Sequence, residues 1–111
     1  LGRADGERFQ ILLMHSPLYF SEARQWGADL TLAGHFHGGT VRIPGLGGLM
    51  TPQYQFFLPW CAGTFLEEGR VMAVGRGLGT HSINIRFNDL PQLLSIRLAP
   101  GDAVTLQEGK L

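Results

Sequence analysis

Charged side chains are scarce in this sequence, and neither sign is in excess. Asp, Glu, Lys and Arg make up 16% of the 111 residues, below the roughly 25% typical of soluble domains. With 9 basic and 9 acidic residues the formal net charge is zero, so the chain lacks the positive field that attracts a polyanion. We therefore expect no nucleic-acid partner, and a surface that is unusually apolar or is partly covered by something else.

Cysteine pairs and long apolar helices are also missing. Cys61 is the single cysteine, so neither an intrachain disulfide nor a Cys-rich zinc fold can form. Residues 43–66 are uncharged but are interrupted by Pro44, Pro52 and Pro59, which excludes a simple membrane-spanning helix. The chain opens on a polar stretch without a targeting signal. Its length fits one small domain or a piece of one, and its start is expected to be a cut or processed end.

Glycine, in contrast, is abundant, and the first third of the chain has the pattern of a β-α-β unit. The 16 glycines favour turns and exclude a helical bundle. Residues 9–14 (FQILLM) form a short apolar run typical of a strand buried on both faces. A short helix is predicted from Ser16 or Pro17 to Gly27, and a second strand over residues 29–33. The two strands should be parallel, with a right-handed crossover, and their carboxyl ends should share one edge of the sheet.

From residue 40 onward, short apolar segments alternate with turn residues, which predicts an antiparallel meander. Residues 44–59 are expected to form a long loop rich in Gly, Pro and aromatics. The chain is thus predicted to have an α/β fold, with one βαβ unit followed by a mostly antiparallel sheet. The candidate strands of this second part are residues 40–43, 60–66, 70–75, 82–87, 93–98 and 103–107.

Three histidines are predicted to meet at the edge where open α/β sheets place their ligands. His15 follows the first predicted strand, and His35 and His37 follow the second within a frame of glycines. Neutral imidazole is a good ligand for Zn, Mn, Fe or Co. For the His-x-His spacing alone, a polar turn is the competing interpretation; the glycines and His15 favour a metal site. Histidines without a carboxylate are an incomplete set, so oxygen ligands must come from elsewhere.

The ordered motifs resemble those of the calcineurin-like metallophosphoesterases. GHFHGG at residues 34–39, preceded by ADLTLA and earlier by ILLMHSP, is similar to the last two metal-binding motifs of that family. The loop of residues 44–59, VMAVGRGLGT at residues 71–80 and the following IRFNDLPQLLSIRL resemble a bacterial subgroup that includes YkuE-like and UDP-2,3-diacylglucosamine hydrolase-like enzymes. The resemblance covers residues 9–98. It implies that the chain forms half of a four-layer αββα sandwich.

The resemblance implies a centre of two divalent metal ions, with Mn, Fe, Zn and Mg as candidates. His15 and His35 would bind one ion and His37 the other. The earlier motifs of the family, Asp-x-His, Gly-Asp-x-x-Asp and Gly-Asn-His-Asp/Glu, do not occur in residues 1–111. We therefore expect the chain to be the carboxyl-terminal portion of a single metallophosphoesterase domain, with the amino-terminal half as its missing partner. Alone, it is expected to be inactive.

For the complete protein, the resemblance implies hydrolysis of a phosphoester or pyrophosphate bond. The substrate would be a phosphorylated small molecule or a lipid-linked one, and the expected location is cytoplasmic or peripheral to a membrane in a bacterium. Arg76 and His81 are the candidates for facing this substrate. A surface or core role is the competing interpretation of His81.

Two further hypotheses concern surfaces. The loop aromatics Tyr54, Phe56, Phe57 and Trp60 could dip into a membrane interface or cover a lipid-bearing substrate; packing beneath the loop or against the missing half is the competing interpretation. The chain could also be a non-catalytic truncated module that self-associates through exposed sheet edges. Its histidines would then hold metal only adventitiously.

Overall fold

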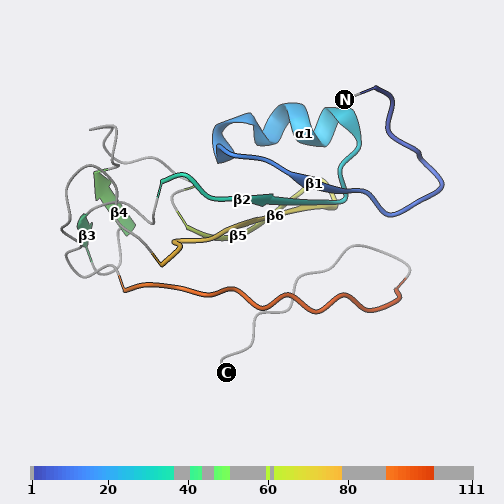
Figure 1. Cartoon of the computed structure of the whole chain (residues 1–111). Helices are drawn as coiled ribbons and strands as arrows, with labels where there is room; N and C mark the ends of the chain where they lie inside the picture. The colour runs from blue at the N-terminus through green and yellow to red at the C-terminus, as the bar shows by residue number, and fades with distance from the viewer. Residues whose placement is uncertain are drawn as a thin grey trace.

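The computed structural model describes residues 2–36, 41–43, 47–50, 60, 62–78 and 90–101. Within these ranges the chain forms an α/β fold in which a short helix lies over one face of a mixed sheet (Figure 1). The sheet has the strand order β1-β2-β6-β5, and β3 and β4 form a separate antiparallel pair. The elements are β1 (Ile11–Leu13), the 3-10 helix η1 (Pro17–Tyr19), α1 (Phe20–Trp26), β2 (Leu30–Ala33), β3 (Val41–Ile43), β4 (Gly47–Met50), β5 (Gly63–Glu67) and β6 (Arg70–Val74).

The predicted β-α-β unit is confirmed. Strands β1 and β2 pair in parallel, with Ile11 opposite Leu30. The helical segment between them begins at Pro17. Ser16 caps it, because the Ser16 hydroxyl accepts a hydrogen bond from the Leu18 N–H at 3.4 Å. It ends at Gly27, whose φ of 111° is left-handed. Glycine adopts this conformation without the steric cost that a Cβ would bring, which is why the helix stops there.

The antiparallel prediction holds for β5 and β6, which form a hairpin. Its turn residues Glu68 and Gly69 both have positive φ, at 50° and 72°, which matches the twist of the flanking strands. On its other side, however, β6 pairs in parallel with β2. This parallel pairing joins the hairpin to the β-α-β unit. The sequence did not mark it, because a partner from a distant part of the chain leaves no local pattern.

Two predictions for the second part are corrected, one of a loop and one of a strand. The expected loop of residues 44–59 contains β4, which pairs with β3. Residues 93–98 form no strand; within the described residues they run as a single extended segment beside the sheet (Figure 1). The alternation of Leu94, Ile96 and Leu98 gave a strand-like period, but no described strand pairs with this segment. The candidate strands at residues 82–87 and 103–107 lie outside the described residues.

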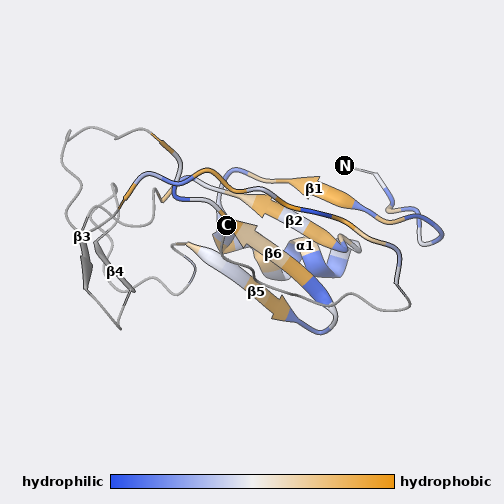
Figure 2. Ribbon diagram, turned by 90° about the horizontal axis from the view of Figure 1, so that it is seen from below, coloured by the Kyte–Doolittle hydropathy of each residue, from blue (hydrophilic) through white to orange (hydrophobic). Residues whose placement is uncertain are grey.

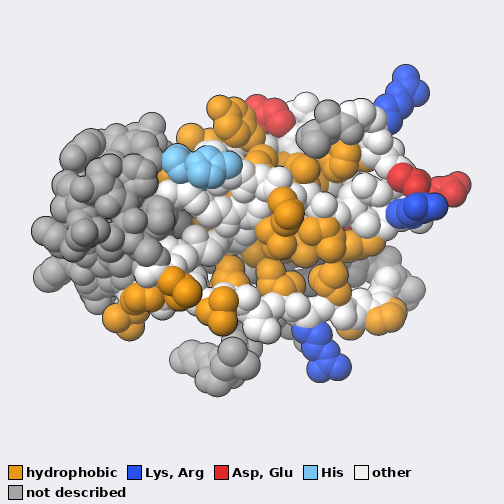
Figure 3. Space-filling view, viewed as in Figure 1, with side chains coloured by type: hydrophobic (Ala, Val, Ile, Leu, Met, Phe, Trp, Pro, Cys, Tyr) orange, Lys and Arg blue, Asp and Glu red, His pale blue; other side chains and the backbone are white. Residues whose placement is uncertain are grey.

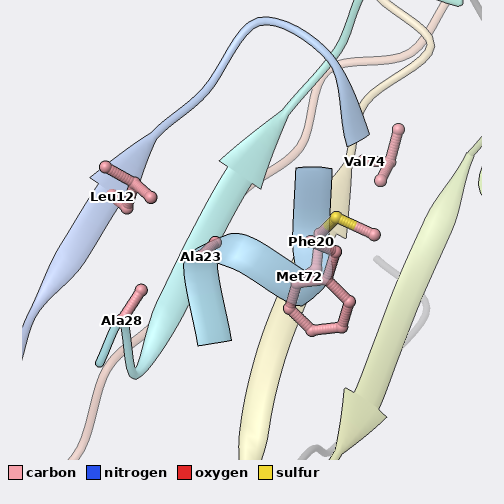
Figure 4. Packing of buried hydrophobic residues seen from close by; sticks show 6 residues of the cluster. All are labelled: Leu12, Phe20, Ala23, Ala28, Met72 and Val74. Carbon is pink, nitrogen blue, oxygen red and sulfur yellow. The ribbon is translucent and has the colours of Figure 1, made fainter. Parts of the chain in front are cut away.

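The hydrophobic core lies between α1 and the sheet face beneath it (Figure 4). Phe20 at the start of α1 and Met72 of β6 are both 0% exposed and lie against each other. Burying a side chain of this size contributes about 1.5–3 kcal/mol to folding. The buried cluster comprises Leu12, Phe20, Ala23, Ala28, Met72 and Val74.

The opposite face of the sheet is only partly covered. Residues 90–101 run along it (Figures 1 and 2), and a Cβ built on Gly75 would lie 3.5 Å from Leu94. On β1, however, Ile11 and Leu13 are 48% and 76% exposed, while Leu12 faces the core. The prediction that this strand is buried on both faces is therefore wrong for the chain as it stands. Within the described residues, no helix has the length and apolar character needed to cross a membrane.

Candidate metal centre

The parallel pairing of β1 and β2 brings His15 and His35 together. Beyond the strands, the Met14 N–H donates to the Leu32 carbonyl at 2.9 Å and the Gly34 N–H donates to the His15 carbonyl at 3.3 Å. The two imidazole rings lie with their centroids 4.2 Å apart and their planes inclined by 46°. In the space-filling view the histidine side chains form one patch on the surface (Figure 3). The predicted convergence is observed for these two histidines.

The backbone at His35 has an uncommon conformation. Its φ is 71°, and the Phe36 N–H donates to the Gly34 carbonyl at 2.9 Å, which makes residues 34–36 a γ-turn with positive φ at its centre. Such turns are rare and strained, and a left-handed residue other than glycine costs about 1–2 kcal/mol. Strain of this kind concentrates at functional sites. The sequence suggests a polar turn here only as the alternative to a metal site, and no pattern marks its positive φ.

Arg76 reaches the same edge of the sheet by way of β6. Since β6 is parallel to β2, their carboxyl ends coincide, and the Gly75 N–H donates to the Ala33 carbonyl at 3.0 Å. The Arg76 N–H in turn donates to Oε1 of Gln92 at 3.2 Å, and the Gln92 N–H donates to the Gly77 carbonyl at 2.9 Å. Gln92 therefore ties residues 90–101 to this edge. No pattern in the sequence marked Gln92 for this role.

The donor set formed by the described residues is partial. His15 and His35 offer two imidazole nitrogens, which suit Zn, Mn or Fe. Among the residues that the structure describes, no three His, Cys, Asp or Glu side chains gather closely enough to hold an ion. His37, assigned to the second ion, and His81 lie outside the described residues, so their predicted roles stay predictions. Oxygen donors, which the resemblance assigns to the missing motifs, are not supplied by this pair.

The spacing of the two rings bears on how an ion would fit. With Zn–N bonds of about 2.0–2.1 Å, two imidazoles on one tetrahedral ion have ring centres roughly 5 Å apart. The observed distance between the ring centroids, 4.2 Å, is shorter. The two rings must therefore rotate slightly before both can bind one ion. His15 is exposed and His35 is half-buried. Rotation is therefore easier for His15.

Trp60 behaves differently from the proposed membrane contact. It packs against the hydrophobic core, with its ring edge-on to Phe20 at a centroid distance of 6.4 Å. This packing on the chain's own core is a third arrangement, distinct from a membrane contact and from packing beneath the loop or against the missing half. Tyr54, Phe56 and Phe57 lie outside the described residues.

Comparison with known proteins links this chain to one class of enzyme. No family model matches it, and no solved structure matches it. Over 93 residues, 84% of the chain, it is 31% identical to a protein of Bacillus subtilis (strain 168) described as the uncharacterized metallophosphoesterase YkuE. The alignment covers 32% of that protein, so the chain spans about a third of the length of the curated relative it matches. The chain is therefore a distant homologue of part of a metallophosphoesterase.

Proposed function

We propose that this chain supplies the histidine-bearing part of a metal-dependent phosphoester or pyrophosphate hydrolase. The observation that carries the proposal is the meeting of His15 and His35, 4.2 Å apart at the ends of two parallel strands. Homology to part of a metallophosphoesterase supports it. The substrate would be a phosphorylated small molecule or a lipid-linked one.

In this proposal the chain's own residues hold the ions and orient the phosphate. His15 and His35 hold one ion, His37 holds the second, and Arg76 and His81 face the substrate. The two ions, when bound, neutralise charge on the phosphoryl oxygens and lower the pKa of bound water. Because imidazole is a neutral ligand, the histidines leave the positive charge of the ions available to an anionic substrate.

The rest of the domain would supply the missing oxygen ligands and cover the open sheet face. The exposed side chains of Ile11 and Leu13 on β1 are apolar surface of the kind that a second layer buries. The chain would then be half of a four-layer αββα sandwich, and the remaining half its partner. Without those ligands, we expect no turnover by the chain alone.

A metal titration of the 111-residue chain tests the first part of this proposal. We expect Zn²⁺ to shift the imidazole resonances of His15 and His35 in ¹H–¹⁵N spectra, and His15→Ala or His35→Ala to abolish the response of the other ring. Leu18→Ala, three residues from His15 but without a metal-binding atom, is the matched control and should leave the titration unchanged. Zn²⁺ shifts that survive both histidine substitutions would argue against the site.

Two further measurements test the hydrolase itself. With p-nitrophenyl phosphate and Zn²⁺ or Mn²⁺, the isolated chain should show no metal-dependent turnover. The gene upstream of residue 1 should encode the Asp-x-His, Gly-Asp-x-x-Asp and Gly-Asn-His motifs. Brisk turnover by the isolated chain, or a parent gene without these motifs, contradicts the proposal.

A non-catalytic, self-associating module is the second candidate, and the position of β1 favours it. This strand is at the edge of the sheet, and Ile11 and Leu13 are exposed on it; an open apolar edge invites pairing with another chain. Sedimentation velocity would show a concentration-dependent dimer that Leu13→Lys disrupts. A chain that stays monomeric at high concentration removes this candidate.

A further inference from the structure

The residue between the two histidines of the His-x-His motif is buried far more deeply than the histidine that precedes it. Phe36 is 1% exposed, whereas His35 is half-buried. The ring of Phe36 lies against the imidazole of His35, with centroids 5.1 Å apart and planes inclined by 41°. The imidazole of His35 is thus in contact with two rings, that of Phe36 and that of His15.

Backbone hydrogen bonds hold the chain in place on both sides of His35. On one side the Gly34 N–H donates to the His15 carbonyl, and across the turn the Phe36 N–H donates to the Gly34 carbonyl. The strained φ of His35 therefore depends on its neighbours. An unconstrained histidine would relax to a right-handed or extended conformation, which is favoured by about 1–2 kcal/mol, and its imidazole would leave His15.

We propose that Phe36 is a positioning residue for the metal centre, which it serves by holding the imidazole of His35 in place. Its buried ring anchors the γ-turn and forms a wall beside the imidazole. His35 is then the fixed ligand, and the exposed His15 is the one that rotates to admit the ion. This inference rests on the proposed function, because it assigns Phe36 a role at that site.

The expected magnitude follows from how ligand-orienting neighbours act elsewhere. Groups that orient metal ligands without touching the metal typically change affinity by about 10- to 100-fold when they are removed. Phe36 makes no hydrogen bond from its side chain, so the lower end of this range is expected. The loss should be in affinity for the ion, with His35 as the ring whose position changes.

Zn²⁺ titrations of the full chain, followed by the imidazole resonances, test this proposal. Phe36→Leu and Phe36→Met keep an apolar side chain and should lower Zn²⁺ affinity by about tenfold. Phe20→Leu is the matched control, because Phe20 is equally buried but its ring contacts are with Trp60 and Arg24 rather than with a histidine. Its affinity should stay within about twofold of the parent chain, well under the change expected at Phe36.

A metal-free measurement keeps the inference separate from the proposed function. In the parent chain the ring current of Phe36 should displace the His35 ring-proton resonances, and Phe36→Leu should remove that displacement while Phe20→Leu retains it. If the parent chain binds no Zn²⁺, the proposed function fails and this displacement alone decides the positioning role. Unchanged affinity and unchanged His35 resonances in Phe36→Leu, or equal losses in Phe20→Leu, overturn the inference.

Discussion

The two ends of the four-stranded sheet differ in how their polar groups are used. At the amino end, Asp29 accepts hydrogen bonds from the Gln10 N–H at 2.8 Å and from the Arg70 guanidinium. Nearby, Arg24 forms an ion pair with Glu68 at 2.7 Å. At the carboxyl end, two imidazoles lie side by side, one of them on a strained turn. In Figure 3 most of the charged side chains in view lie away from the histidine patch.

This contrast indicates a division between stability and chemistry. The amino end joins β1, β2 and β6 through one partly buried carboxylate, which links residues far apart in the chain. The carboxyl end holds ligand-type side chains close together and accepts an unfavourable φ to do so. Loss of the Asp29 carboxylate should therefore change folding with little effect on metal binding, whereas loss of either imidazole should abolish metal binding.

The largest effect is expected for Asp29→Ala. The carboxylate is 19% exposed, and its removal leaves the Arg70 guanidinium and the Gln10 N–H without this partner, at a cost of about 2–4 kcal/mol in unfolding free energy. Asp5→Ala is the matched control: Asp5 also pairs with an arginine and a backbone N–H, but it is 48% exposed, so its loss should be about 0.5 kcal/mol. Urea unfolding measures both. Equal losses would show that the amino end is not organised around Asp29.

A smaller effect is expected from relieving the strain at His35. Both His35→Gly and His35→Ala delete the imidazole, but only glycine fits a φ of 71° without steric cost, so the glycine variant should be more stable by about 1 kcal/mol. At the exposed helical Gln25 the order should reverse, with glycine less stable than alanine by about 1 kcal/mol. Thermal unfolding of the four variants measures the difference. An alanine variant as stable as the glycine one would mean that the turn relaxes.

The smallest effect is expected for Glu68→Ala. Glu68 is 83% exposed and pairs with Arg24, which Glu67 also contacts at 3.4 Å. Exposed ion pairs contribute about 0–1 kcal/mol, and the second carboxylate lowers the loss further, so a change of about 0.3 kcal/mol is expected. Urea unfolding with and without 1 M salt measures it. A loss of unfolding free energy as large as that for Asp29→Ala would show that surface ion pairs, rather than Asp29, stabilise this end of the sheet.

The convergence of His15 and His35 could be predicted because it depends on local signals. Apolar runs mark two strands, Gly27 ends the helix between them, and parallel neighbours must share their carboxyl edge. The positive φ of His35 could not be predicted, because its cost is offset by tertiary contacts such as the burial of Phe36. The Asp29–Arg70 pair was equally hidden, since its partners are 41 positions apart.

The exposed face of β1 shows another limit of sequence reasoning. The run of residues 9–14 is apolar enough for burial on both sides, yet only Leu12 of the three strand residues is buried. An apolar pattern shows which surfaces are suited to burial. Burial itself occurs only where other atoms of the protein cover those surfaces.

The neighbour relation between β2 and β6 has a consequence for how the molecule acquires its shape. Forming the β1-α1-β2 unit brings together residues that are close in the sequence. Pairing β6 with β2 instead closes a much longer loop of the chain. Long loops close slowly. The entropic cost of closing them grows only with the logarithm of loop length, so each doubling of the length adds about 0.6 kcal/mol. We expect the histidine pair, which depends on β1 and β2, to assemble early. Arg76, which depends on β6, should join it late.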